Sequence, residues 1–119
     1  MANTTRVTRV ADLIQQVLAE ALYREVSDPR LKLVSFSGVE VSRDLAHATI
    51  FVSVLGDAMA DQEAMKALQK ANGFLRNYVA KHCQLRITPQ LHFELDQSVR
   101  EGQKMDALIA KATEKKQHD

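Results

Sequence analysis

The sequence has a single cysteine and no tryptophan among its 119 residues. One cysteine excludes an intrachain disulfide, which is typical of proteins in a reducing compartment. No stretch approaches the run of about 20 apolar residues that a membrane span needs, and the first residues lack the apolar run of an export signal. We therefore expect a protein of the cytoplasm that has no membrane partner.

Neither sign of charge dominates, and aromatic residues are few. The 16 Lys and Arg against 15 Asp and Glu leave a net charge of +1, so composition alone does not indicate a nucleic-acid binder. The charges are nevertheless segregated, with acids gathered in 57–63 and 94–101 and bases in 66–86 and 104–116. A chain of this length suits one domain with an aliphatic core. We expect this domain to span residues 1–119, with flexible ends at 1–5 and 114–119.

Hydrophobic periodicity predicts how the first half of the chain folds. Apolar residues at helical spacing predict a helix over 6–25, which Asp28-Pro29 ends because the residue before proline avoids helical backbone angles. Strands are predicted over 34–42 and 46–54, with a bulge at Gly38, where the apolar residues change parity. Because the connection between them is short, the two strands should form an antiparallel hairpin.

The second half predicts a helical segment over 60–82 and a third strand over 91–95. A capping box at 98–101 then precedes a short amphipathic helix. The fold class is therefore α+β, with a three-stranded sheet that has helices on one of its faces. Such a sheet buries one apolar layer and leaves its other face partly open.

A basic stripe in the helical segment is the strongest functional signal. At about 3.6 residues per turn, one side of this helix carries a row of exposed positions: Lys66, Lys70, Gly73, Asn77 and Lys81. A glycine inside a helix costs roughly 1 kcal/mol relative to alanine, and here it leaves bare backbone where a phosphate chain can come near. The alternative interpretations are that the lysines only solvate a helix face and that Gly73 only permits tight packing.

Further candidates for phosphate contact lie around this stripe, and most have an alternative role, which for Arg6 and Arg9 is a solvated helix end. Asn72 adjoins the glycine, and Arg76 either points to a groove beside the sheet or covers apolar surface. Arg43 at the hairpin tip either reaches RNA or pairs with Asp44. The remaining candidates are Arg86, which would extend the basic stripe, and Arg6 and Arg9, which sit at the start of the first helix, where a cation opposes the helix dipole.

No grouping of side chains indicates catalysis. His82 and Cys83 are neighbours in a helix and point about 100° apart, so they do not converge on one ligand. The other histidines, His47, His92 and His118, lack zinc-like spacing. We expect no enzyme activity, no metal, no cofactor and no small-molecule substrate.

Five blocks of sequence, in order along the chain, resemble the ribosome-binding factor A family of bacterial small-subunit assembly factors. They are Ser27 to Leu31, Val39 to Leu45, Ala71 to Arg76, Leu85 to Phe93, and Asp96 to Ser98. The resemblance implies a K-homology-like fold of the second topological type, in the order α-β-β-α-kink-α-β plus a C-terminal helix. It also implies that Ala71-Asn72-Gly73 is the Ala-x-Gly kink of that family.

The same resemblance implies a function. A member of this family is expected to bind the immature small (30S) ribosomal subunit and to assist late maturation of 16S rRNA, including its 5′-end region, with a role in cold adaptation and no catalysis. We expect a monomer. No two glycines are three residues apart, so the Gly-x-x-Gly clamp of ordinary K-homology domains is absent. The alternative is a protein-interaction module that uses the same scaffold to dock a partner protein.

Overall fold

The computed structural model describes residues 2–96, and the predicted capping box, C-terminal helix and tail lie outside this range. Its elements are α1 (Ala2–Arg24), the 3-10 helix η1 (Pro29–Leu31), β1 (Val34–Val41), β2 (His47–Val54), α2 (Ala58–Cys83) and β3 (Gln90–Leu95). The predicted α+β order is confirmed over the described residues.

The sheet has the order β1-β2-β3, with β1 antiparallel and β3 parallel to the central strand β2. Phe36 pairs with Val52, but Gly38 pairs with Phe51, so one extra residue lies on β1 between them. This shift confirms the predicted bulge at Gly38. It allows the valines that follow it to face the same side as Phe36, although they differ from it in parity.

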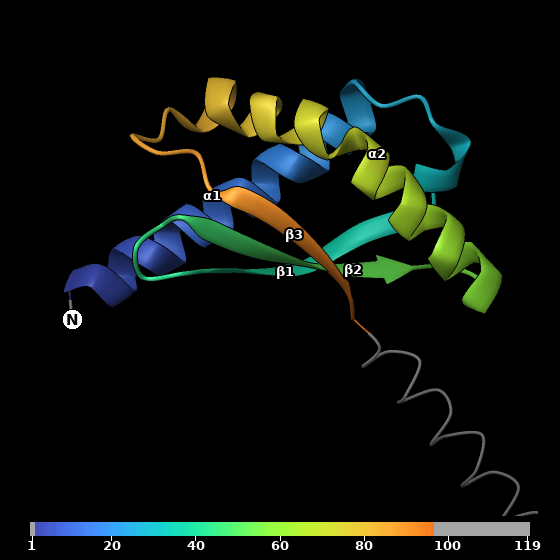
Figure 1. The fold of residues 1–119 in the computed structure, drawn as a ribbon, viewed down its shortest axis with the longest axis horizontal. Coiled ribbons are helices and arrows are strands. Elements are labelled where there is room, and N and C mark those ends of the chain that lie inside the picture. Colours follow the sequence, from blue (N-terminus) through green and yellow to red (C-terminus); the bar gives the residue numbers. More distant parts are fainter. Residues whose placement is uncertain (1, 97–119) are drawn as a thin grey trace, which may run out of the picture.

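Both helices cover one face of the sheet (Figure 1). On β2 the buried residues alternate with partly exposed ones, as expected for a sheet with one covered face. α1 contributes a stripe at helical spacing, and α2 contributes a second one. The fully enclosed side chains at the centre of this core are Ile14, Leu18, Ile50, Val52, Leu68, Leu75 and Val79.

The start of α1 differs from the prediction. The helix begins at Ala2, so the expectation that residues 2–5 lie outside it is wrong. Nothing between Asn3 and Thr5 is a strong helix breaker, and the first apolar residue of the stripe was a poor marker of the helix start. Within residues 2–96, neither helix is long and apolar enough to cross a membrane.

α2 is one continuous helix, which corrects the expected division into two helices at Gly73. The ribbon of α2 does change direction part of the way along its length (Figure 1), so the bend occurs without a break in the helix. Asp57 caps its first turn, because the side-chain Oδ1 accepts a hydrogen bond from the Ala60 N–H at 2.9 Å. Gln84 ends it in a left-handed conformation.

Candidate nucleic-acid interface

The basic stripe of α2 lies on the solvent side of the helix. Its five positions are all exposed, whereas Leu68, Leu75 and Val79, on the opposite side of the helix, have no exposed area. At about 1.5 Å of rise per residue, Lys66 and Lys81 are separated by about 22 Å along the axis. We call these five positions, Lys66, Lys70, Gly73, Asn77 and Lys81, the basic face.

Gly73 leaves bare backbone in the middle of the basic face. A Cβ built at this position meets no heavy atom within 4 Å. The alternative that Gly73 exists to permit tight packing inside the domain is therefore wrong, because no described residue would clash with a side chain there. The roughly 1 kcal/mol that glycine costs in a helix is not compensated by any contact within the described fold.

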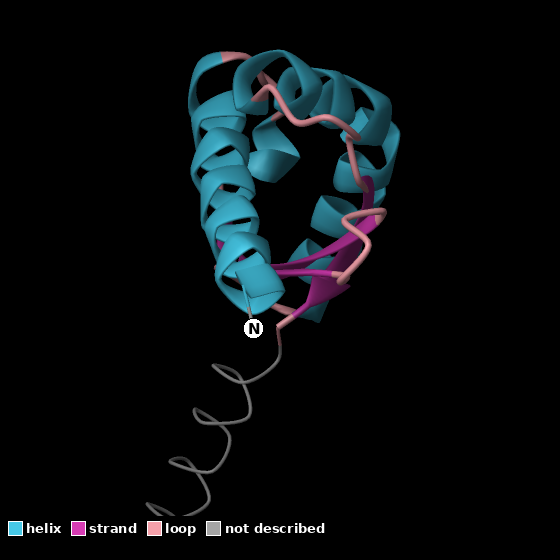
Figure 2. Cartoon of the chain, turned by 90° about the vertical axis from the view of Figure 1, so that its left-hand side faces the viewer, coloured by secondary structure: helices cyan, strands magenta, loops and turns pink. Residues whose placement is uncertain are grey.

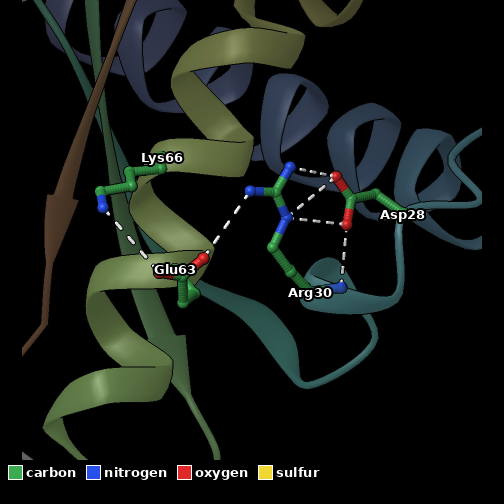
Figure 3. A network of polar contacts seen from close by, with 4 residues as sticks. All are labelled: Asp28, Arg30, Glu63 and Lys66. Atoms are coloured by element: carbon green, nitrogen blue, oxygen red, sulfur yellow. Dashed lines mark hydrogen bonds and ion pairs between the residues drawn. The ribbon is translucent and has the colours of Figure 1, made fainter.

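A network of charges flanks the N-terminal end of the basic face (Figure 3). Asp28 caps η1 by accepting the Arg30 N–H at 2.9 Å, and its carboxylate also binds the Arg30 guanidinium at 2.7 Å. The side-chain hydrogen bond from Arg30 is the main cause that lowers the pKa of Asp28 to about 2. Arg30 then reaches Glu63 of α2 at 3.8 Å. These contacts explain the Ser27 to Leu31 block: it fixes the loop after α1 against α2.

Lys66 forms the last ion pair of this network, yet most of its side chain remains exposed to solvent. Its ammonium nitrogen lies 3.8 Å from Glu63, and 70% of its side chain is exposed. A long, exposed pair of this kind contributes little free energy. Neither Lys70 nor Lys81 has an ion pair with any residue in the described part of the chain.

Asn72 and Arg76 hold the fold together instead of facing solvent freely. The Asn72 amide donates to the Leu91 carbonyl oxygen at 3.1 Å. The Arg76 guanidinium donates to the carbonyl oxygens of Thr88 and Pro89, at 3.0 and 3.2 Å. Arg76 therefore binds the connector that leads into β3, a role that the sequence did not predict.

A row of rings beside the basic face was not predicted. Phe74, Tyr78 and His82 follow one another at intervals of four residues, with ring centroids 6.3 and 3.9 Å apart. Phe74 retains 45% of its exposed area and lies next to Gly73. The spacing of these residues is readable in the sequence, but Tyr78 and His82 also fall at the spacing of the apolar side of α2, so the sequence alone does not set them apart from core residues.

The hairpin tip excludes one of the two alternatives for Arg43, the salt bridge with Asp44. The carboxylate of Asp44 accepts the Ser42 hydroxyl at 2.6 Å and the Ala46 N–H at 3.1 Å. These bonds lower the pKa of Asp44, chiefly through the Ser42 hydroxyl. Arg43 forms no ion pair with a described residue, so the turn salt bridge is wrong and its guanidinium is exposed.

The remaining arginines lie at the opposite end of the molecule from η1. Arg6, Arg9 and Arg86 are exposed. Because α1 begins at Ala2, Arg6 is already past the first turn of the helix and Arg9 is further along. The predicted opposition between these cations and the helix dipole therefore has little force, since it fades within the first turn.

The described residues offer no centre for metal or nucleophilic chemistry. Within residues 2–96, no three or more His, Cys, Asp or Glu side chains are grouped to hold a metal ion. His47 and His92 contact each other on the sheet, with Nδ1 and Nε2 3.0 Å apart. Burial raises the pKa of the Cys83 thiol, which disfavours the reactive thiolate.

Comparison with known proteins gives a single family. The family model of ribosome-binding factor A matches residues 6–109. The ribosome-binding factor A of Pseudomonas fluorescens is 47% identical over 117 residues, which cover 96% of this chain and 88% of that protein. The Pseudomonas paraeruginosa protein of the same name is 46% identical over 110 residues, covering 91% and 86%.

Solved structures resemble the fold. An NMR structure of a putative ribosome binding factor A from Thermotoga maritima has a TM-score of 0.70 and 38% identity, covering 78% of this chain and 89% of that one. A homology model of the Thermus thermophilus ribosome binding factor A, fitted into a cryo-EM map of its complex with the 30S subunit, has a TM-score of 0.65 and 24% identity, covering 76% of this chain and 96% of that one. These neighbours have a K-homology-like fold, which is the fold that the family resemblance of the five sequence blocks implied for this chain.

Proposed function

Because this chain belongs to the ribosome-binding factor A family, we propose that it binds the immature small ribosomal subunit through the basic face of α2. The bound factor assists late maturation of 16S rRNA, including the 5′-end region, and supports growth in the cold. It does so in the cytoplasm, without catalysing a reaction and without a cofactor. Membership of the family supports the choice of partner, and the exposed lysines of α2 support the choice of contact surface.

The observation that carries this proposal is that the basic face is exposed and has few ion pairs with other described residues. Its lysines are exposed, and among the described residues only Lys66 has an ion pair, which is long. Gly73 leaves the backbone open at the centre of the row. Lysine ammonium groups neutralise phosphates and supply affinity, whereas they read little sequence. A phosphate chain lying along α2 would meet cations on both sides of the bare position.

The ring row adds a second mode of contact. The exposed ring of Phe74 lies beside Gly73 and is suited to stack on an unpaired base, as aromatic side chains do in RNA-binding proteins. Because Asn77 lies one turn after Gly73 on the same face, its amide group is placed to donate to a phosphate oxygen. Together these groups fit an RNA strand at the surface of a folded particle without a Gly-x-x-Gly loop.

Differential binding explains how such a contact assists maturation. A protein shifts an equilibrium only when it binds one arrangement better than another. The factor would therefore favour the rRNA arrangement that fits the basic face and leave when the mature arrangement no longer fits. Unfavourable rRNA arrangements exchange more slowly at low temperature, so the need for such a factor should grow in the cold.

An apolar groove supports the alternative function, which is that of a protein-interaction module. It measures about 510 Å³ and lies between α1, η1 and β1. Tyr23, one of its lining residues, is 89% exposed. An exposed apolar patch of this kind is typical of protein docking. If the chain is a protein-interaction module, this groove is therefore the surface on which a partner protein would bind.

Co-sedimentation with purified immature small subunits at increasing salt distinguishes the two functions. Binding through phosphates should weaken steeply, with a slope of log affinity against log salt of about −0.7 for each phosphate neutralised on a single strand. The triple variant Lys66→Glu, Lys70→Glu, Lys81→Glu should lose binding while it keeps the melting temperature of the parent. Normal co-sedimentation of the folded variant, or salt-independent binding that Tyr23→Asp abolishes, would favour the protein module instead.

A further inference from the structure

Three separate segments meet at the end of the molecule that carries the N-terminus (Figure 1). Figure 2 looks onto this end, where the hairpin turn and the connector before β3 lie beside the first part of α1. They enclose a cavity of about 180 Å³. Its lining residues are Arg6 and Val10 of α1, Asp44 and Leu45 of the hairpin turn, and Gln84, Leu85, Arg86 and Ile87 of the connector.

The lining combines apolar side chains with cations. Val10 is buried, and Leu45 and Leu85 pack against the core. Arg6 and Arg86 are exposed, and neither has an ion pair with a described residue. Ile87 is 59% exposed, which is high for an isoleucine at the mouth of a cavity. Apolar surface between two unpaired guanidinium groups matches an apolar ring that carries a phosphate.

The backbone is strained at this cavity. Leu45 and Gln84 have φ values of 61° and 50°, and no other non-glycine residue in the described range has a positive φ. The left-handed conformation is unfavourable for a residue with a side chain, and glycine is the usual residue at a helix end such as Gln84. Both positions keep side chains that line the cavity. Strain of this kind concentrates at binding sites.

We propose that this cavity binds one unpaired nucleotide of RNA, with the base against the apolar side chains and the phosphate between Arg6 and Arg86. The proposal deepens the proposed function, because it adds a base-binding site to a surface that otherwise contacts phosphates. The volume is below the roughly 300–1,000 Å³ of pockets for drug-sized ligands, and it suits a single planar base. Proteins that read unpaired RNA take bases into such pockets.

Asp44 gives the cavity a base preference. Its Oδ1 already accepts two hydrogen bonds inside the turn, from the Ser42 hydroxyl and the Ala46 N–H. The carboxylate can only accept, so it should select a base edge that donates. Guanine presents two adjacent donors, its ring N–H and its amino group, on the Watson–Crick edge. We therefore expect guanine to bind better than uracil.

The test is an NMR titration of the ¹⁵N-labelled full chain with guanosine 5′-monophosphate, uridine 5′-monophosphate and inorganic phosphate. The guanine nucleotide should shift the amides of Leu45, Gln84 and Leu85 saturably and several-fold more tightly than the uracil nucleotide. Phosphate alone lacks the base and should shift these amides far less than the guanine nucleotide does. Absence of saturable shifts at these positions, or equal shifts with phosphate alone, would overturn the nucleotide site.

Two variants sharpen the result. Asp44→Asn keeps the acceptor that Ser42 and Ala46 use but places an amide N–H₂ where guanine donates, so it should abolish the preference for guanine. Retention of that preference would overturn the role of Asp44. Arg86→Ala should weaken the binding of both nucleotides. The titration measures binding at the cavity without ribosomal subunits. A negative titration would therefore not contradict binding through the basic face. Equally, normal co-sedimentation of the triple lysine variant would not contradict nucleotide binding at the cavity.

Discussion

The two flanks of α2 carry the same kinds of side chain and use them differently. On the flank toward β3, Asn72 and Arg76 donate to main-chain carbonyl oxygens of Thr88, Pro89 and Leu91. On the outer flank, Lys70 and Lys81 have no ion pair within the described residues. A cation near a suspected RNA site is therefore not evidence of RNA contact until its internal partners are known.

This difference separates the residues of α2 that stabilise the fold from the residues of the same helix that we propose bind the subunit. Substitutions on the core side and on the β3 flank should act mainly on the free energy of unfolding. Substitutions on the outer flank should act mainly on the affinity for the subunit. The predictions below test this separation, from the largest expected effect to the smallest.

The core side of α2 should give the largest effect. Leu68 has no exposed area, and Leu68→Ala should lower the free energy of unfolding by about 2–5 kcal/mol, because it removes buried methyl groups and leaves a cavity. Chemical denaturation followed by circular dichroism measures this loss. The folded fraction should still co-sediment with small subunits, and a binding defect beyond the loss of folded protein would contradict the separation.

The β3 flank should give a smaller effect on stability. Arg76→Ala removes two hydrogen bonds from a charged group and should cost about 1–3 kcal/mol. Arg76→Lys should rescue little, since an ammonium group does not reproduce the planar fork that reaches both carbonyl oxygens. Lys70→Ala is the matched control on the outer flank and should leave stability unchanged. Equal melting temperatures for the Arg76 and Lys70 variants would break the comparison.

The ion network beside the basic face should stabilise the fold near neutral pH and lose this effect in acid. The lowered pKa of Asp28 means that its carboxylate stabilises the fold above the ordinary carboxyl pKa of about 4. That contribution is lost as the pH falls toward 2. Asp28→Asn should therefore unfold more easily than the parent at pH 6, and the two should converge near pH 2. A constant difference across this range, measured by denaturant midpoints, would assign the effect to something other than the charge.

Much of this fold was predictable because its signals are local. The alternation of β2 and the change of parity at Gly38 indicated both strands and the bulge. The helix ends were less predictable: α1 begins at Ala2 and α2 at Ala58, since a helix extends beyond its apolar stripe when capping groups such as Asp57 are available.

The candidate site also has features that could be predicted from the sequence and features that could not. The exposure of the basic face follows from helical spacing alone, which made it predictable. The bonds of Arg76 and Asn72 depend on carbonyl groups 12 to 19 residues away in the chain. No short-range pattern contains that information. The cavity near Arg86 depends on three segments that meet only in the folded chain, so the sequence could suggest the arginines and not their shared surroundings.

Gly73→Ala gives the smallest change and the most direct test of the central claim. A methyl group at this position meets nothing within the described fold, so the variant should be more stable by up to about 1 kcal/mol. If the bare backbone is where the subunit comes close, the same methyl group should weaken co-sedimentation with immature small subunits several-fold. The account predicts a higher melting temperature together with lower affinity. A higher melting temperature with unchanged affinity would contradict it.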